Sequence, residues 1–143
     1  MTTTLESRRF GSVPLTEEAI VRFSEGLPGF EELREFLLLG PPDLAPVQFL
    51  VSLEDPEISF PILAAQLCLS DYAPKLDDAE LRALGVADPS ALAVYAILTF
   101  HHECERVTAN LRAPVLINPS ARVGRQVTLG DSTHSLRHAL VGG

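Results

Sequence analysis

Short apolar runs separated by glycine and proline clusters recur along this chain, and they predict a protein built mostly of β-strands. The longest run, residues 91–100, favours a strand in the middle of a sheet because it is rich in Val, Ile, Tyr and Phe and follows Pro89 in a turn. Helix is the competing interpretation of that run. The other expected strands cover residues 19–23, 36–39, 47–53, 59–69, 105–111, 115–118 and 122–129.

One segment, residues 77–85, carries the signals of a helix. Asp77 can cap its first turn, Glu80 completes a capping-box pattern, and Gly85 is a natural stop. Eight or nine short strands with one short helix predict a mostly β, antiparallel β-barrel-like fold, with a sandwich as the related alternative. We expect a single domain over residues 1–143, with the last few residues frayed.

Several positions predict irregular backbone. Pro114 separates two apolar runs and belongs at a strand start, an edge or a bulge, because proline donates no hydrogen bond to a sheet. Gly124 suggests a bulge or bend in the last strand, and Pro61 a bend in the fourth. Residues 30–36 have apolar side chains at helical spacing and could form one helical turn, just after the glycine- and proline-rich turn at 26–29.

Charge is distributed unevenly along the 143 residues, whose formal net charge is −8. The formal charge is −7 over residues 1–75, −5 over 76–105 and +4 over 106–143. Most of such a surface should repel nucleic acid and attract a basic protein. The basic last third could touch phosphate, although scattered arginines are more often simply solvated.

The chain should be a cytoplasmic protein. Its N-terminus lacks the apolar segment of a signal peptide, and no apolar run is long enough to cross a bilayer. Cys68 and Cys104 do not form a CxxC pair, and we expect two reduced thiols, although a single bridge between them is open.

Residues 101–105 contain two histidines, a cysteine and two glutamates, which suggests metal binding. On a strand, however, His102 and Cys104 face one side while the other three face the opposite side, so neither side offers the four ligands of a structural zinc site. His134 and His138 lie at helical spacing, but nothing forces them to converge with this segment. We expect no metal and no other cofactor.

Signals of catalysis are weak. No serine or cysteine lies in a nucleophile elbow, and the turn at residues 26–29 lacks the spacing and the lysine of a phosphate-binding loop. Glu54, Asp55 and Glu57 could form an acid–base pair, but adjacent acids on a turn beside a proline are usually solvated. The sequence therefore favours a binding protein over an enzyme. A small metal-dependent hydrolase around His101, His102 and Cys104 is the weaker alternative.

Four motifs, in this order and spacing, resemble the bacterial flagellar assembly factor family, FliW. They are Gly26-Leu-Pro-Gly-Phe-Glu31, Leu53-Glu-Asp-Pro56 followed by Phe60, Asn110-Leu-Arg-Ala-Pro-Val-Leu-Ile-Asn118 and Gly124-Arg-Gln-Val-Thr-Leu129. Residues 131–138 resemble the closing segment of the family, with His134 where an aromatic residue is usual. Gln66 stands near a position where the family commonly has a proline.

The resemblance implies a small β-barrel-like protein without enzymatic activity that binds cytoplasmic flagellin. When flagellin is exported, the freed factor binds the RNA-binding regulator CsrA and relieves its repression of flagellin translation. An acidic protein suits this role, because a CsrA surface that contacts RNA phosphates must be basic. The runner-up function is a barrel that binds nucleic acid or oligosaccharide through the basic last third, although the chain has no tryptophan and only two tyrosines for stacking.

Two groups of residues are candidates for partner binding. Flagellin termini are amphipathic helices, so their site should be an apolar groove, which Phe30, Leu33 and Phe36 could line unless they belong to the core. The candidates for binding basic CsrA are the acidic residues Glu54, Asp55, Glu57, Asp71, Asp77 and Asp78.

Overall fold

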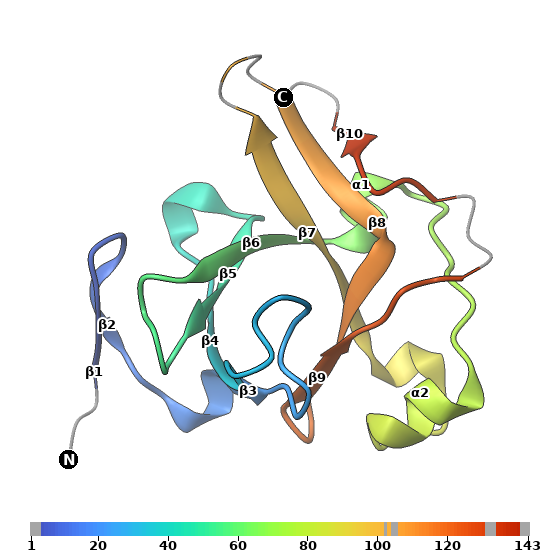
Figure 1. The fold of residues 1–143 in the computed structure, drawn as a ribbon, viewed down its shortest axis with the longest axis horizontal. Helices are drawn as coiled ribbons and strands as arrows, with labels where there is room; N and C mark the ends of the chain where they lie inside the picture. The colour runs from blue at the N-terminus through green and yellow to red at the C-terminus, as the bar shows by residue number, and fades with distance from the viewer. Residues whose placement is uncertain (1–3, 102, 104–105, 131–133, 141–143) are drawn as a thin grey trace.

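The computed structural model describes residues 4–101, 103, 106–130 and 134–140. Seven strands close into a barrel, in which each strand pairs with the next and the last, β9, meets the first, β3, through a parallel bridge between Arg22 and Val123 (Figure 1). The predicted mostly antiparallel, barrel-like β fold is therefore confirmed. The barrel strands are β3 (Ile20–Arg22), β4 (Glu35–Leu39), β5 (Gln48–Ser52), β6 (Ser59–Ala64), β7 (Ala93–His101), β8 (Arg106–Asn118) and β9 (Val123–Gln126).

Three further strands lie outside the barrel. The hairpin of β1 (Thr4–Ser7) and β2 (Gly11–Pro14) stands to one side, and β10 (His138–Ala139) runs along the outer edge of β8 (Figure 1). The sequence did not predict the hairpin. Its buried apolar side chains are only Leu5 and Val13, which pack against Phe49 and its neighbours, so the pattern in the sequence is weak.

Helices are short. In α2 (Asp78–Ala83), the Asp77 carboxylate accepts a hydrogen bond from the Glu80 amide at 2.9 Å, so the predicted helix and its cap are confirmed. The expectation of a strand to residue 69 is wrong in its second half, where α1 (Ala65–Cys68) begins because the chain turns there to pack Ala65 against β7 and β8. Single 3₁₀ turns are η1 (Glu17–Ala19), η2 (Pro42–Leu44) and η3 (Pro89–Ala91).

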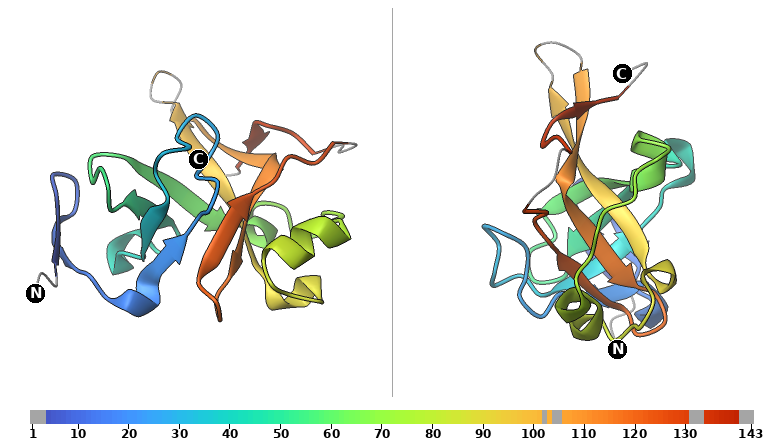
Figure 2. Two further views of the ribbon diagram at one scale, coloured as in Figure 1. Left: turned by 60° about the horizontal axis from the view of Figure 1, so that its bottom comes forward. Right: turned by 90° about the vertical axis from the view of Figure 1, so that its right-hand side faces the viewer.

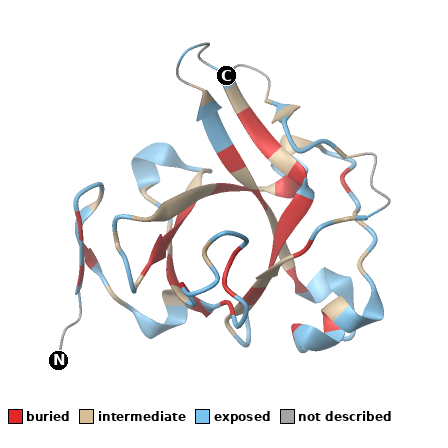
Figure 3. Ribbon diagram, in the orientation of Figure 1, coloured by how far each residue is buried: buried red, intermediate tan, exposed pale blue. Residues whose placement is uncertain are grey.

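Barrel strands alternate between two buried faces. Along β5, Leu50 faces the barrel interior, while Phe49 and Val51 face the N-terminal hairpin. Along β8, Val115 and Ile117 face inward and Leu116 faces α2. This explains why the strands read as nearly continuous apolar runs rather than alternating ones. Buried residues line the barrel wall and continue along β8, whereas the far end of β7 is exposed (Figure 3).

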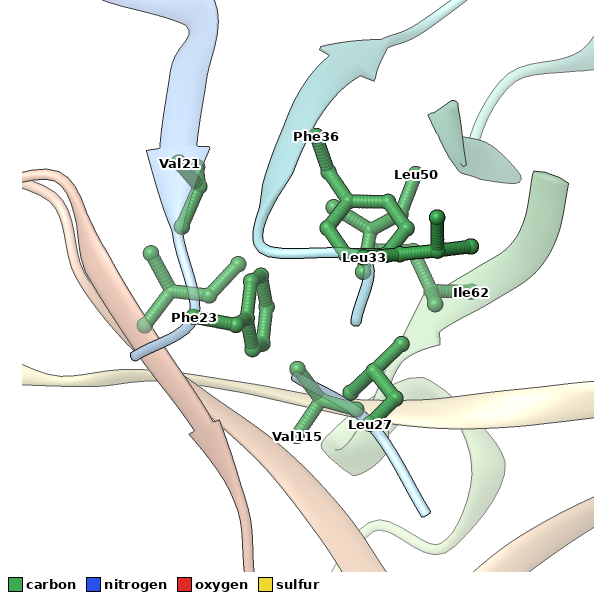
Figure 4. Close-up of a cluster of buried hydrophobic side chains, with 9 residues drawn as sticks. Val21, Phe23, Leu27, Leu33, Phe36, Leu50, Ile62 and Val115 are labelled. Carbon is green, nitrogen blue, oxygen red and sulfur yellow. The ribbon is translucent and has the colours of Figure 1, made fainter. Parts of the chain in front are cut away.

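The loop between β3 and β4 folds over one end of the barrel and inserts Leu27, which is 1% exposed (Figures 1 and 4). Gly26 adopts a φ of +65°, and a Cβ there would lie 2.6 Å from backbone atoms of Phe30 and Glu31. The Glu31 carboxylate accepts a hydrogen bond from the Gly29 amide. The loop between β3 and β4, which contains the Gly-Leu-Pro-Gly-Phe-Glu motif, thus closes this end of the barrel. We call residues 23–34 the plug loop, or plug. The expected helical turn over residues 30–36 is wrong, because Phe30 instead pairs with Leu27 and β4 starts at Glu35.

Strand β8 contains the irregularity expected at Pro114. Between the pairs Tyr95–Val115 and Ile97–Asn110, one residue of β7 faces four of β8, so residues 111–114 bulge. Gly124, in contrast, pairs regularly with Ile117, and the bulge expected there is absent. The reason for glycine is the ring of Phe23, which would lie 2.6 Å from a Cβ at this position.

Candidate partner-binding surfaces

The acidic side chains of the turn between β5 and β6 bind backbone amides, both at the start of β4 and within the turn. The Glu54 carboxylate accepts hydrogen bonds from the amides of Arg34, at 3.2 Å, and Glu35, at 3.3 Å. Asp55 accepts one from the amide of Glu57, and Glu57 forms an exposed ion pair with Arg8 at 3.7 Å. All three acidic side chains are exposed, but Glu54 has a structural task that a binding role would compete with.

Asp71, Asp77 and Asp78 are also exposed. They belong to the segment between α1 and α2 and to the start of α2, which lie across the barrel from the β5–β6 turn (Figures 1 and 2). The structure therefore separates the six acidic candidates into two groups of three. Asp77 caps α2, whereas no hydrogen bond or ion pair of the Asp71 or Asp78 side chain is found within the described part of the chain. These two carboxylates are available to a partner without loss of an internal contact.

A hollow of about 610 Å³ lies beside this second acidic group. It is formed where the segment after α1 crosses the start of β7 and η3, and its lining is mostly apolar. Burial raises the pKa of Tyr95, one of the lining residues. Its lining includes the side chains of Gln66, Tyr72, Pro74, Leu76, Leu92 and Tyr95.

Carboxylates stand next to the hollow at three points of the chain. Asp71 precedes Tyr72, Asp77 follows Leu76, and Asp88 precedes Pro89; each of these neighbours lines the hollow. Lys75 is the only lysine or arginine between residues 64 and 81. Sequence reasoning missed Asp88, which is exposed and accepts a hydrogen bond from the Ser90 amide that lowers its pKa. Its place beside the same hollow as Asp77 arises only in the fold, so the sequence held no signal for it.

The residues expected to line an apolar groove for flagellin belong mostly to the core. Phe36 is fully buried and Leu33 is 6% exposed, and both point into the barrel with Phe23 and Leu27 (Figure 4). Phe30 is half-buried against Phe60, with ring centroids 5.2 Å apart. The expectation of an open groove at these three residues is corrected, because β4 and the plug turn their side chains inward.

Tyr72 anchors the segment between the helices. Its hydroxyl donates a 2.6 Å hydrogen bond to the carbonyl of Leu111, and burial raises its pKa to about 12. His134 is one of two positions where the family resemblance led us to expect a different residue, and its ring packs against Tyr72 with centroids 4.6 Å apart. The other such position, Gln66, is exposed at the hollow. Both positions therefore lie close to this surface.

Helix α2 is fixed to the barrel by two polar side chains. Asn118 is 6% exposed; its amide donates to the Leu84 carbonyl at 2.8 Å, and its oxygen accepts from the amides of Ser120 and Ala121. Arg125 bonds Glu80 of α2 at 2.7 Å and Glu25 of the plug loop at 3.0 Å. The acidic helix is thus held firmly rather than loosely tethered.

Two of the five arginines of the basic last third are engaged within the chain. Arg125 is engaged by two carboxylates, and Arg122 donates to the Glu17 carbonyl. The other three, Arg106, Arg112 and Arg137, are exposed. Cys68 is a free thiol whose pKa is raised by burial. Cys104, His102 and Glu105 lie outside the described residues, as do residues 141–143.

In the described part of the chain, no three His, Cys, Asp or Glu side chains gather to hold an ion. His101 instead contacts the hydroxyl of Thr108 at 2.9 Å. Among the described residues, no helix is long and apolar enough to span a membrane.

A closed seven-stranded barrel plugged by one loop, with an outer hairpin and a short acidic helix, defines a class of small β-barrel proteins. The family model for FliW protein matches residues 4–140, and the chain belongs to the FliW family. A flagellar assembly factor FliW from Thermotoga neapolitana is 36% identical over 135 residues, covering 94% of this chain and 91% of the relative. One from Bdellovibrio bacteriovorus is 35% identical over 136 residues, covering 95% and 78%.

The fold agrees with this membership. A crystal structure of the flagellar assembly factor FliW superposes with a TM-score of 0.85 and 33% sequence identity, covering 95% of each chain. The family expected from the sequence motifs is thus confirmed.

Proposed function

We propose that this chain is a non-enzymatic cytoplasmic protein of flagellar assembly that binds flagellin and CsrA in turn. Binding to CsrA would relieve repression of flagellin translation. The observation that carries the proposal, beyond family membership, is the apolar hollow with exposed carboxylates beside it. An apolar floor suits one face of an amphipathic helix, and the carboxylates suit a basic protein surface.

We place CsrA on the α2 side of the barrel, at Asp71, Asp77 and Asp78, and flagellin in the adjoining hollow. Among the described residues, the Asp71 and Asp78 side chains make no hydrogen bond or ion pair that a partner would have to break. Two partners on neighbouring sites would hinder each other sterically, which gives partner switching a physical basis. Glu54, Asp55 and Glu57 remain candidates for a weaker, long-range electrostatic contribution, because Glu54 and Asp55 are committed to backbone amides.

The test is a titration of the purified chain with purified CsrA and with flagellin from the same organism. Asp71→Lys with Asp78→Lys should weaken CsrA binding at least about tenfold, since two attractive charges become repulsive. The matched control is Glu18→Lys with Asp43→Lys, which changes net charge equally at exposed positions of η1 and η2, outside the six candidate residues. The loss should shrink as salt rises, because exposed charges are screened over about 8 Å at physiological ionic strength.

Flagellin binding is tested at the hollow. Leu76→Gln should weaken it while leaving CsrA binding largely unchanged, and Leu136→Gln, at an exposed leucine elsewhere, is the control. Equal loss of CsrA affinity from both charge pairs would contradict the placement on the α2 side. Failure of the unmodified chain to bind either protein would contradict the proposed function itself.

A further inference from the structure

The outer half of β7 has one sheet edge with which no strand of the described residues pairs. Residues 97–101 of β7 pair with residues 106–110 of β8 and project beyond the barrel (Figures 1 and 2). On the other side, β6 pairs with β7 only through residues 62–64, opposite 95–97. Strand β6 then continues toward Ser59 paired with β5 alone.

Pro61 explains where the β6–β7 ladder ends. Extending the register from the Ile62–Ile97 pair places Pro61 opposite Leu98. The Leu98 carbonyl would need an amide hydrogen from residue 61, and proline has none. The ladder therefore stops, and a hollow of about 450 Å³ opens between the strands, lined by Arg9, Pro61, Leu98, Thr99 and Phe100.

The hydrogen bonds of β8 show which way the backbone N–H and C=O groups of β7 point. The Val107 carbonyl accepts from the Leu140 amide, so the backbone groups of Val107 point away from β7. Because alternate residues of a strand point to opposite edges, Thr108 bonds toward β7 and is paired with Thr99. Phe100, opposite Val107, consequently directs its N–H and C=O away from β8 and toward the hollow. The Leu98 carbonyl points the same way.

We propose that this β7 edge at Leu98–Phe100, which we call the open edge, binds an extended segment of a partner protein as an added antiparallel strand. The Phe100 N–H and the carbonyls of Leu98 and Phe100 provide backbone hydrogen bonds to the segment. The Phe100 side chain, 40% exposed, supplies an apolar contact. Natural sheets protect exposed edges with lysine, proline or a bulge, and the Leu-Thr-Phe sequence of the open edge has none of these.

Arg9 sets the charge of the segment. Its guanidinium lies over the ring of Phe49 at 5.2 Å and lines the hollow, and it forms no ion pair with a carboxylate of the described residues. An incoming segment with a carboxylate beside Arg9 is therefore favoured over a basic one. A second copy of this chain is disfavoured for two reasons. Two molecules that each carry a net charge of −8 repel each other, and pairing of their open edges would also bring the two Arg9 side chains together.

The first measurement is amide hydrogen exchange in the full-length chain, read residue by residue by NMR. The Phe100 amide should exchange faster than those of Thr99 and His101, which point toward β8. The probe is a capped synthetic peptide of alternating Val and Thr with one central Glu. When the protein is saturated with this peptide, amide exchange at Phe100 should slow by at least about tenfold. A Phe100 amide that is already protected, or that the peptide does not slow, would overturn the proposal.

Two variants separate backbone from side-chain recognition. Phe100→Ala removes the ring and should weaken peptide binding moderately, whereas Phe100→Pro also removes the outward N–H and should abolish it. Proline is tolerated at an edge where its N–H would face away from the paired strand. Equal affinity of the two variants would count against strand addition.

A third test exchanges charges in the peptide and at Arg9 and leaves the sequence of β7 unchanged. The chain should bind the Glu peptide more tightly than a matched Lys peptide, and Arg9→Glu should reverse this preference. Protection of Phe100 that depends on protein concentration, without peptide, would instead identify a second copy as the occupant and overturn the proposed partner. These outcomes do not depend on CsrA or flagellin, so the inference stands or fails separately from the proposed function.

Discussion

At the scale of single residues, Gly124 has a packing role that its dihedral angles do not reveal. A Cβ here would lie 2.6 Å from the Cζ atom of Phe23, which is fully buried and cannot move aside. We expect Gly124→Ala to lower the free energy of unfolding by about 1–3 kcal/mol, because overpacking displaces the ring and its neighbours. Urea unfolding measures the change.

Gly130→Ala is the matched control, since a Cβ at residue 130 meets no atom within 4 Å. Adding Phe23→Leu to Gly124→Ala should recover part of the lost stability relative to the sum of the single changes. If Gly124→Ala and Gly130→Ala unfold at the same urea concentration, close contact with Phe23 does not explain the glycine.

Tyr72 predicts how stability depends on alkaline pH. Burial raises its pKa to about 12 in the folded chain, against about 10 for an exposed tyrosine. The folded state thus favours the protonated phenol, and its contribution is complete below about pH 10 and is lost as the pH rises to about 12. The loss should be about 2–3 kcal/mol in the free energy of unfolding.

Tyr72→Phe should remove that alkaline decrease. Near neutral pH it should also cost about 1–2 kcal/mol, because the Leu111 carbonyl loses its hydrogen bond from the phenol. Denaturant unfolding at a series of pH values measures both effects. Tyr95→Phe is the comparison, because burial also raises the pKa of Tyr95. An unchanged alkaline decrease in Tyr72→Phe would contradict this account.

At the scale of elements, local chemistry predicted α2 and most barrel strands. The Asp77 and Glu80 pattern defines a cap by itself, and apolar runs of β-forming residues define β5 and β7. The elements that sequence reasoning missed depend on distant contacts. Strand β6 gives way to α1 because Ala65 has to meet β7 and β8, which lie some thirty or more residues further along the chain.

The candidate surfaces divide in the same way. Exposure of Glu54, Asp71 and Asp78 followed from their charge, but the separation of Glu54 from the other two follows from barrel closure. Leu33 and Phe36 were ambiguous, because an apolar side chain beside a turn can face a groove or the core. Only the plug conformation, with Leu27 inserted, decides for the core.

At the scale of the whole molecule, Arg125 joins three parts that are distant in sequence. It lies on β9, bonds Glu80 of α2 at 2.7 Å and pairs with Glu25 of the plug loop at 3.0 Å. Glu80 is 23% exposed and Glu25 68% exposed. Because water screens exposed pairs, the contact with Glu80 should contribute more to stability than the contact with Glu25.

Arg125→Met removes the charge and keeps much of the aliphatic stem, and should lower the free energy of unfolding by about 1–2 kcal/mol. Double-mutant cycles with Glu80→Gln and with Glu25→Gln should give coupling energies of about 1 kcal/mol and at most a few tenths of a kcal/mol, respectively. Amide exchange should accelerate in both α2 and the plug loop of Arg125→Met, since each loses a contact to the barrel. A negligible coupling with Glu80, or faster exchange confined to the plug loop, would mean that Arg125 does not hold α2. In that case, Asn118, through its hydrogen bond to the Leu84 carbonyl, would be left as the main polar attachment of the acidic helix.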